Sequence, residues 1–561
     1  MRLIIWLSDL LYDALALVRN LWSTLRRRGS VYVLLELAGG YPEHRPPAAW
    51  WVRRRPESVE EVRRRLRVLA ADPSVAGVVV TASGLDAGLA TIQSLRSALA
   101  RFRDSGKRVI AYLPQASTRL YYLASVADTV VMPESGTLNL VGLTLEATFL
   151  GEALGRAGVA AEFEQIAEYK SAAEPFVRGS MSAPMREALN AILDSVYDDV
   201  VRDIAAARRL DPVAIQRVVN RAPLSASAAR DAGLVDAVLF EDELPGYLAV
   251  GARRPEIAPW VLARRRLRRP LRWRSPGRAI AVITVRGAIH MGESRARPPV
   301  PLPLPFVSED TAGHATIARA IRAAERNPGF GAIVLSVESP GGSALASDLI
   351  WREVRRADRT KPVVAFLGNV AGSGGYYVAA GARRIVCLPG TLTGSIGVIS
   401  GKFSVRELVG RAGVHREILA RGETATIFSL FVPFSAEERR RLHAQAEETY
   451  DRFVSRVAEG RTLPRETVLA AAKGRVWTGR QAQCHGLVDE LGDFTAAVDA
   501  AKRLMGIAPS RAVRVVHVRP PRGLALPNSS ASGVLSALAP ALGALLEERI
   551  LAVMPYQVSV R

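Results

Sequence analysis

Residues 363–388 read VVAFLGNVAGSGGYYVAAGARRIVCL, which is a short apolar run, a glycine-rich turn, an apolar helical stretch and a second apolar run. Runs of this length are typical of strands buried in a sheet. Two more such runs precede it, AIAVITVRG (279–287) and GAIVLSV (331–337). They alternate with the helix-like stretches TIARAIRAAERN (316–327) and ALASDLIWREVRRAD (344–358). This alternation predicts an α/β fold with a largely parallel sheet.

The same pattern occurs earlier in the chain, at VIAYLPQASTRLYYLASVADTVVMP (109–133). The pairs Tyr121-Tyr122 and Tyr376-Tyr377 stand at the same offset as two RAGV motifs, which begin at Arg156 and Arg411. Further on, DAGLVDAV is echoed by CHGLVDEL. Self-similarity in a constant order indicates an internal duplication. The prediction is therefore two tandem α/β domains that arose by duplication.

The expected domains cover residues 30–252 and 279–508, because 561 residues exceed what one ordinary core holds. Residues 253–278 form a basic linker with eight Arg in its last sixteen positions, read either as a solvated segment or as a contact for anionic lipid. Residues 1–29 form an N-terminal segment, and residues 509–561 form a C-terminal extension.

The N-terminal segment is apolar over residues 3–22, but Asp9, Asp13 and Arg19 interrupt it. A helix that crosses a bilayer needs about 20 apolar residues with few charges. An amphipathic helix lying on the membrane therefore fits best, with a single span and a soluble packing helix as alternatives. The Pro-rich residues 297–306 are expected to form a loop beside the second domain, and residues 523–546 a docking helix or amphipathic tail.

The charge and cysteine content restrict the possible ligands. The net charge is +21, and only six of the 75 basic residues are Lys. This balance suits an anionic membrane surface, or it reflects an Arg-rich composition without a role. Because no recognised nucleic-acid motif accompanies the arginines, we expect no nucleic-acid partner. Two cysteines provide neither a disulfide framework nor a cysteine metal site.

Two glycine-rich elements in the second copy suggest a catalytic serine. SPGGS (339–343) and AGSGGYY (371–377) each follow a predicted strand and precede a helix. Ser373, flanked by glycines, suits an exposed nucleophile. The N–H groups of Gly374 and of Gly341 or Gly342 would then form an oxyanion hole. The alternative is that these glycines make tight turns or bind a phosphate.

A serine nucleophile needs a base. Of the seven histidines, His290 and His485 remain candidates. Lys170, in EYKSAAEPF (168–176) of the first copy, is the alternative. A lysine base must be neutral near pH 7–8, which requires a fall in pKa of about 3 units, and burial can supply it. Ser–Lys pairs are an established variant of the catalytic triad.

Five motifs appear in order: EYKSAAEPF, SPGGS, GSGGYY, TLTGSIGV and GRVWTGRQAQCHGLVDELG. Together they resemble the long, two-repeat form of the signal peptide peptidase A family, also called protease IV, over about residues 30–508. The resemblance implies the crotonase-like α/β fold shared with the proteolytic subunit of Clp protease. It implies Ser373 as nucleophile, Lys170 as general base and Ser395 as the residue that orients the lysine. Gly374 and the amides of Gly341 and Gly342 match the oxyanion hole, and no metal or cofactor is implied.

The duplication supports this division of roles. At the offset of the tyrosine pairs, Thr118 stands opposite Ser373, and Ala425 stands opposite Lys170. Each copy therefore keeps half of a site. This predicts a site at an interface between domains or subunits.

The function that follows is a serine endopeptidase that degrades cleaved signal peptides and other hydrophobic, unfolded peptides at a membrane. The resemblance further implies a lipid surface as partner, a homo-oligomer, expected to be a tetramer, and the bacterial inner membrane as location. The catalytic part is expected on the periplasmic side, with the cytoplasmic face left open. The alternatives are a non-catalytic membrane scaffold or chaperone on the same fold, and a crotonase-type acyl-CoA enzyme.

Overall fold

The computed structural model describes residues 13–20 in part and residues 30–45, 56–251, 253–268, 277–294, 310–518 and 551–553. The chain divides into two compact units. The described residues of unit 1 fall within Met1–Thr144 and Val196–Pro276, and those of unit 2 within Leu145–Ser195 and Gly277–Ser559. The predicted N-terminal segment, the Pro-rich loop and the tail over 523–546 lie wholly or largely outside the described residues.

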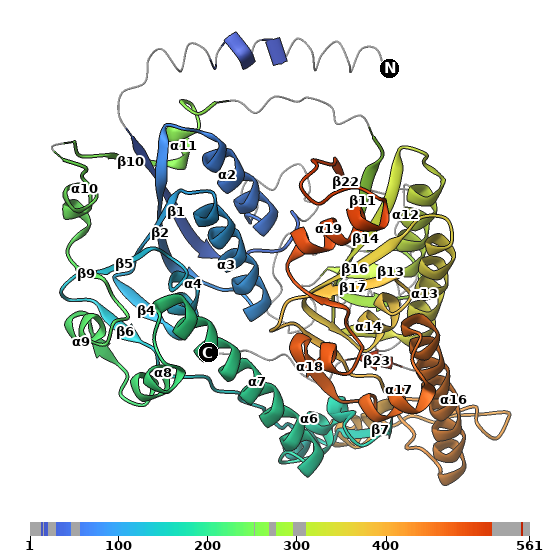
Figure 1. Cartoon of the computed structure of the whole chain (residues 1–561). Helices are drawn as coiled ribbons and strands as arrows, with labels where there is room; N and C mark the ends of the chain where they lie inside the picture. Colours follow the sequence, from blue (N-terminus) through green and yellow to red (C-terminus); the bar gives the residue numbers. More distant parts are fainter. Residues whose placement is uncertain are drawn as a thin grey trace. The chain divides into compact units, whose positions relative to one another are not determined.

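Unit 1 is built on a parallel sheet with strand order β10-β1-β2-β3-β5-β9 (Figure 1). Its central strands are apolar on both faces, as expected when helices cover a parallel sheet. Helix α2 starts at a capping box in which Ser58 Oγ accepts from the backbone N–H of Glu61. The elements are β1 (Val31–Gly39), α2 (Val59–Ala71), β2 (Val75–Leu85), α3 (Leu89–Asp104), β3 (Arg108–Tyr112), α4 (Thr118–Ala124), β5 (Thr129–Met132), α8 (Pro212–Val219), α9 (Ala226–Asp231), β9 (Ala237–Val238) and β10 (Glu256–Pro259).

Unit 2 repeats this sheet as β22-β11-β14-β16-β17-β21, again parallel, with β18 and β20 added beyond β16. The strands are β11 (Ala279–Arg286), β14 (Phe330–Ser339), β16 (Val363–Gly372), β17 (Arg384–Cys387), β18 (Leu392–Gly394), β20 (Val476–Thr478), β21 (Glu490–Leu491) and β22 (Val515–His517). The helices are α12 (His314–Arg326), α13 (Ala344–Asp358), α14 (Gly374–Ala379), α16 (Ala436–Arg461), α17 (Arg465–Ala471), α18 (Gly479–Cys484) and α19 (Phe494–Leu504).

Equivalent side chains make equivalent contacts in the two units. Tyr121 donates its hydroxyl to Leu234 O at 2.7 Å, and Tyr376 donates to Leu487 O at 2.9 Å. Each leucine lies in a GLVD motif whose aspartate pairs with an arginine, Arg208 with Asp236 in unit 1 and Arg461 with Asp489 in unit 2. The predicted α/β class with two duplicated domains is confirmed.

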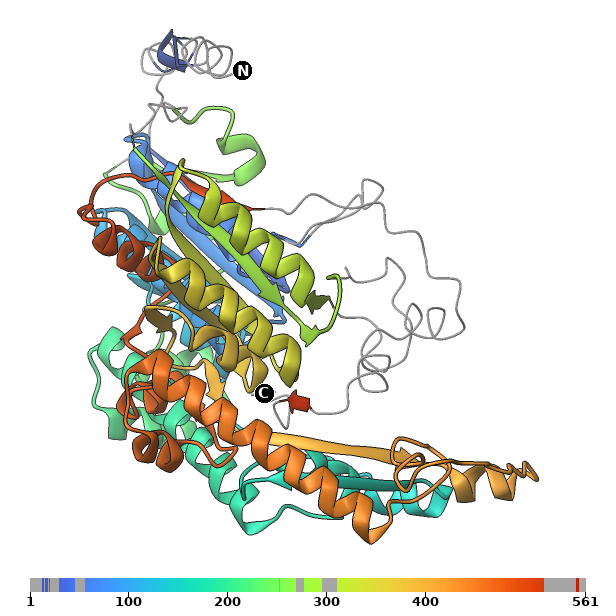
Figure 2. The same ribbon diagram turned by 90° about the vertical axis from the view of Figure 1, so that its right-hand side faces the viewer.

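Unit 2 contains a second sheet, of order β13-β12-β15-β23-β19-β7. Its strands are β7 (Ala160–Ile166), β12 (Ala288–His290), β13 (Thr311–Gly313), β15 (Gly341–Ser343), β19 (Val398–Ser404) and β23 (Leu551–Val553). Strands β7 and β19 are antiparallel and run along helix α16, as Figure 2 shows. Ile166, Val398 and Ala446 form the apolar contact between this pair and the helix.

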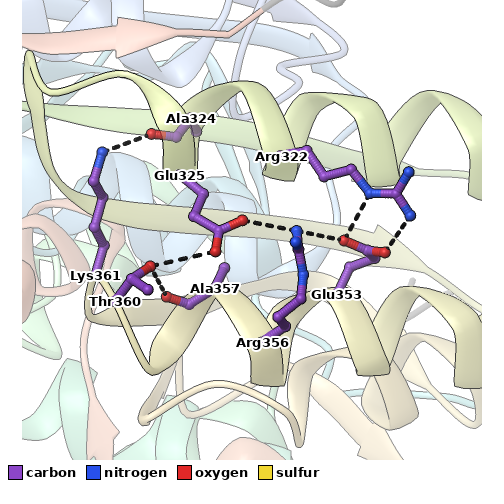
Figure 3. A network of polar contacts seen from close by, with 8 residues as sticks. All are labelled: Arg322, Ala324, Glu325, Glu353, Arg356, Ala357, Thr360 and Lys361. Atoms are coloured by element: carbon purple, nitrogen blue, oxygen red, sulfur yellow. Dashed lines mark hydrogen bonds and ion pairs between the residues drawn. The ribbon is translucent and has the colours of Figure 1, made fainter.

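A charged network joins α12 to α13 (Figure 3). The Glu353 carboxylate accepts from Arg322 Nε at 3.1 Å and from Arg356 at 2.8 Å, and Arg356 also reaches Glu325 at 2.7 Å. Burial alone would raise the pKa of Glu353, but the two arginines outweigh it and hold the pKa below its usual value. The network therefore ties α12 to α13, the helix that begins directly after β15.

Two boundaries differ from the sequence interpretation. Part of the expected linker is folded, since β10 pairs with β1. The second domain extends past residue 508, because β22 pairs with β11. These edge strands have three or four residues and lie near arginines and prolines, so they show no clear periodicity. The segment 145–195, assigned by the repeat to the first copy, belongs to unit 2. Within the described part of the chain, no helix has both the length and the hydropathy to cross a bilayer.

Candidate active site

Ser373 lies in a tight turn between β16 and α14. Its backbone has φ 52° and ψ −114°, a conformation that a non-glycine residue rarely adopts. The turn is held because the Ser373 N–H donates to Gly394 O at 2.8 Å. A Cβ on Gly375 would lie 2.6 Å from Ser339 O, so glycine is needed for α14 to pack against the end of β14. The glycines around Ser373 therefore allow the turn that presents its hydroxyl.

Lys170 follows β7 and is fixed through its backbone. The Tyr169 N–H donates to Lys473 O at 2.9 Å, and the Lys170 N–H donates to Ala167 O at 3.2 Å. Two glycines leave room for the residue. A Cβ on Gly474 would lie 2.5 Å from Lys170 N, and a Cβ on Gly397 would lie 3.1 Å from Lys170 Cδ. A side chain at position 397 or 474 would therefore collide with Lys170, and the glycines leave that space to the lysine.

The Lys170 amine lies within hydrogen-bond distance of both Ser373 and Ser395. Its Nζ lies 2.7 Å from Ser373 Oγ, 3.0 Å from Ser395 Oγ and 2.9 Å from Ser395 O. All three residues are fully buried, with 0% of their surface exposed. Burial holds the pKa of Lys170 well below its usual value, because a buried charge loses its hydration. The neutral amine is therefore favoured.

The chemistry of this arrangement follows from the groups that a neutral amine carries. It has two N–H donors and one lone pair. If the N–H groups donate to the carbonyl and hydroxyl oxygens of Ser395, the lone pair faces Ser373 Oγ. The Ser373 hydroxyl then donates to Lys170 Nζ, which is the geometry for removing a proton from a nucleophile.

Backbone strain is concentrated at this place. Six non-glycine residues of the described chain have positive φ, and four of them are Ala167, Ser373, Ser395 and Lys473. The other two, Arg209 and Thr462, follow the C-terminal ends of helices α7 (Ala183–Arg208) and α16. Unfavourable backbone conformations persist where the surrounding structure enforces them, and they are common at active sites.

The three glycines predicted to form the oxyanion hole lie in two different elements. Gly374 is the first residue of α14, directly after Ser373. Gly341 and Gly342 lie in β15, with φ of 106° and 151°. The Gly341 N–H donates to Ser339 Oγ at 3.2 Å in this structure. Gly342 cannot carry a side chain, because its Cβ would lie 2.0 Å from Ile289 O.

The two histidines considered as bases contact other groups. His290 bonds through its ring nitrogens to Met291 O at 2.7 Å and to Thr311 Oγ1 at 2.9 Å. The His485 ring lies against Trp477, with ring centroids 4.2 Å apart. The group 2.7 Å from Ser373 Oγ is the Lys170 amine.

Lys170, Ser373 and Ser395 all belong to unit 2. The duplication suggested a site at an interface, whereas the structure places these residues inside one compact unit of one chain. The reason is that β7, which comes from the first copy, pairs with β19 of the second over residues 160–166 and 398–404. The lysine that follows β7 is thereby carried to the serine.

The model of peptidase family S49 matches residues 101–252 and 355–508, one range in each repeat. The chain belongs to peptidase family S49. It is therefore a serine peptidase. The chloroplastic serine protease SPPA of Arabidopsis thaliana is 31% identical, with 84% of this chain and 68% of that protein covered. Protease 4 of Haemophilus influenzae is 32% identical, with 79% and 72% covered. A solved structure of the S97A mutant of the 1510-N membrane-bound stomatin-specific protease covers 44% of this chain and 99% of its own, at 15% identity and a TM-score of 0.27.

Two residues of this S49 peptidase were missed as site residues, Gly397 and Gly474. Both stand in motifs already singled out, TLTGSIGV and GRVWTGRQAQCHGLVDELG. The sequence does not show that they contact Lys170, because they are far from it along the chain. Lys473, with φ 52°, was likewise not singled out.

Ser395→Ala is expected to lower kcat of this S49 peptidase by about 10- to 100-fold with little change in KM. The substitution removes one of the two oxygens that hold the Lys170 amine, while the carbonyl of residue 395 remains. The measurement is steady-state cleavage of a peptide. Ser347→Ala is the matched control, since its buried hydroxyl donates to the carbonyl oxygen of Ser343, the residue that precedes α13. Equal losses in both variants would contradict a positioning role for Ser395.

Proposed function

We propose that this serine peptidase uses Ser373 as nucleophile and neutral Lys170 as general base, and that it degrades cleaved signal peptides and other extended, hydrophobic peptides at a membrane surface. The observation that carries the proposal is the 2.7 Å separation of Lys170 Nζ from Ser373 Oγ in a fully buried setting. The motifs of the signal peptide peptidase A family support the substrate class.

The reaction would proceed in two steps. Ser373 Oγ attacks the peptide carbonyl carbon while its proton passes to Lys170 Nζ, and Ser395 holds the resulting ammonium. The N–H of Gly374 and an N–H of the β15 glycines would stabilise the negative oxygen of the tetrahedral intermediate. The amine product then leaves with the proton from Lys170. A water molecule, deprotonated by Lys170, releases the acyl group and restores Ser373.

The pH dependence tests the base. A solvated lysine with a pKa near 10.4 would be neutral in well under 1% of molecules at pH 7. Because burial lowers the pKa of Lys170, we expect kcat/KM on a quenched apolar peptide to be substantial at pH 7–8. The base acts when neutral, so activity falls as the pH falls through the pKa of Lys170. A profile that rises tenfold per pH unit up to pH 10 would contradict a depressed lysine pKa.

A second titrating group must be separated from Lys170. Burial raises the pKa of Glu338 to about 7, and its carboxylate accepts from Asn369 N at 2.8 Å, close to Arg286. Glu338→Gln removes this titration. We expect the acid limb to persist in Glu338→Gln. If it disappears there, Glu338 rather than Lys170 sets the profile. Substrate preference is read from the same assay with a charged peptide of equal length, which should be cleaved more slowly.

We also propose that the protein acts as a homo-oligomer, with a tetramer expected. Apolar side chains are exposed on α15 (Arg406–Arg411) and in the loop after it: Leu408, Val414, Ile418 and Leu419, the last with 94% of its surface exposed. Patches of this kind commonly mark contacts between proteins. Light scattering should give a mass several times 60.5 kDa, and Leu419→Ser should lower it. A monomer at micromolar concentration would contradict the proposal.

A lipid surface is the second proposed partner. The net charge of +21 would favour an anionic membrane, and the same charge supports a location at the bacterial inner membrane. The side of that membrane on which the catalytic part lies stays a prediction, and we expect the periplasmic side.

A further inference from the structure

Strand β16, which leads to Ser373, changes its partner part-way along. Residues 364–367 pair with β17 (Figure 1), whereas residues 370–372 pair with β18. The last residue of β18 is Gly394, which directly precedes Ser395. The Ser373 N–H donates to Gly394 O at 2.8 Å. The change of partner therefore brings the strand that ends at the nucleophile beside the strand that ends at Ser395.

This change of partner coincides with a bulge between β16 and β14. The partner of Val337 is Leu367, whereas the partner of Ser339 is Ala371. Glu338 alone therefore lies opposite the three residues of β16 between Leu367 and Ala371. Extra residues in a bulge lose their place in the ladder, so their backbone N–H groups need other acceptors.

The Glu338 carboxylate supplies those acceptors. Its Oε2 accepts from Asn369 N at 2.8 Å, and the carboxylate also accepts from the Val370 N–H and the Asn369 side chain. A Cβ on Gly368 would overlap Glu338 Oε2. Gly368 has no positive φ, so its glycine is needed for room and not for its backbone conformation. A side chain thus replaces the ladder where β16 passes from β17 to β18.

Glu338 is itself held from the neighbouring strand β11. Its C=O accepts from the Gly287 N–H at 2.9 Å, and Arg286 stands opposite it in the sheet. The positive charge of Arg286 favours the carboxylate form. The next residue, Ser339, donates its hydroxyl to Gly287 O at 2.7 Å. The carboxylate is therefore a fixed point to which the bulge can be attached.

We propose that Glu338 is a positioning residue for catalysis, whose carboxyl oxygen takes up the N–H groups of the β16 bulge and so holds Ser373 beside the Lys170 amine. The inference rests on the proposed function, because it takes Ser373 as the nucleophile. Glu338 acts through the backbone of β16 and not on the reacting atoms.

The bulge requires an acceptor oxygen rather than a negative charge. Burial raises the pKa of Glu338 to about 7, so the carboxyl is partly protonated at neutral pH. A protonated carboxyl keeps an acceptor oxygen, and so does the neutral amide of glutamine. Glu338→Gln should therefore hold the bulge. Glu338→Leu, which fills similar space without an acceptor, should release it.

The first test is peptide cleavage by the full chain. We expect Glu338→Leu to lower kcat by about 10- to 100-fold with little change in KM, because displacing a reacting group by about 1 Å has an effect of this size. Glu338→Gln should retain most of the wild-type kcat. The matched control is Glu353→Leu, which removes a carboxylate bound by Arg322 and Arg356 between α12 and α13. Equal losses in Glu338→Leu and Glu338→Gln, or in Glu338→Leu and Glu353→Leu, would overturn the inference.

Gly368→Ala displaces the same carboxylate without altering it. The new methyl group takes the place of Glu338 Oε2, and alanine meets no left-handed backbone strain at this position. We expect kcat to fall by about 10- to 100-fold here too. The double variant Gly368→Ala with Glu338→Leu should be no slower than Glu338→Leu, because both changes remove the same hydrogen bonds. Additive losses would overturn the inference.

A further readout does not depend on turnover. Hydrogen exchange at the amides of Asn369, Val370 and Ser373 should be faster in Glu338→Leu than in the wild type, and unchanged in Glu338→Gln and Glu353→Leu. Unchanged exchange in Glu338→Leu would overturn the inference, whatever the kinetics. If exchange follows the expected pattern but the wild type cleaves no peptide, the role of Glu338 in placing Ser373 is upheld and only the proposed function fails.

Discussion

Lys170→Met is expected to lower kcat by about 1,000- to 10,000-fold, because it removes the only amine within hydrogen-bond distance of Ser373 Oγ among the described contacts. Methionine is close to lysine in length and fills the space between Gly397 and Gly474, so the fold should be retained. KM should change little. The measurement is turnover of a quenched apolar peptide.

Ser373→Ala should have an equal effect, and the double variant should be no slower than either single variant, because the two groups act as one unit. Lys361→Met is the matched control. Burial also lowers the pKa of Lys361, but its amine donates to Ala324 O at 3.0 Å, at the end of α12. Substantial activity in Lys170→Met would mean that another group serves as the base.

The same variant should also be more stable than the wild type at neutral pH. In the unfolded chain the lysine keeps its proton up to about pH 10.4, whereas burial makes the folded protein release it at lower pH. Between the two pKa values the unfolded state binds more protons, so wild-type stability rises with pH. The cost of the buried lysine is therefore largest at low pH and absent above about pH 10.4.

Lys170→Met does not carry this cost. Its advantage in stability should be greatest at pH 7 and should shrink by about 1.4 kcal/mol per pH unit between the folded and unfolded pKa values. Denaturation midpoints of both proteins at pH 7, 9 and 10 measure the trend. An advantage that stays constant or grows with pH would mean that Lys170 is protonated in the folded protein.

Much of the fold could be predicted because its signals are local. The apolar runs that became β11, β14, β16 and β17 are bounded by glycine or charged residues, and each copy repeats them in order. The short edge strands β10 and β22 could not be predicted, because three or four residues show no period. Strand β23 is a similar case, since its pairing with β15 depends on the tertiary structure alone.

The candidate site likewise has features that the sequence predicts and features that only the fold reveals. Ser373 could be selected from its glycine neighbours, and Lys170 from a motif in a chain with few lysines. Their 2.7 Å contact could not be derived from spacing, since it depends on the pairing of β7 with β19. For the same reason the sequence suggested a site at an interface, although these residues share one unit. The space that Gly397 and Gly474 leave for Lys170 is also apparent only in the folded structure.

Gly474→Ala is expected to lower kcat by about 100-fold, although Gly474 contacts no reacting atom. A Cβ at this position would lie 2.5 Å from Lys170 N and 2.7 Å from Lys170 Cα, which are backbone atoms that cannot rotate away. Lys170 must therefore move by a large fraction of an ångström. A displacement of about 1 Å at a catalytic group can cost about 100-fold in rate.

The control for Gly474→Ala is Gly413→Ala. Gly474 has φ +77° and Gly413 has φ +74°, so alanine meets the same backbone strain at both positions, but a Cβ on Gly413 has nothing within 4 Å. Any loss of stability common to both variants reflects that strain, and the difference in kcat isolates the contact with Lys170. If the amine is displaced toward water, its pKa rises toward the usual value, so the acid limb of kcat/KM should move to higher pH in Gly474→Ala alone. Equal losses of kcat in the two variants, or an unmoved acid limb, would show that Gly474 does not position the base.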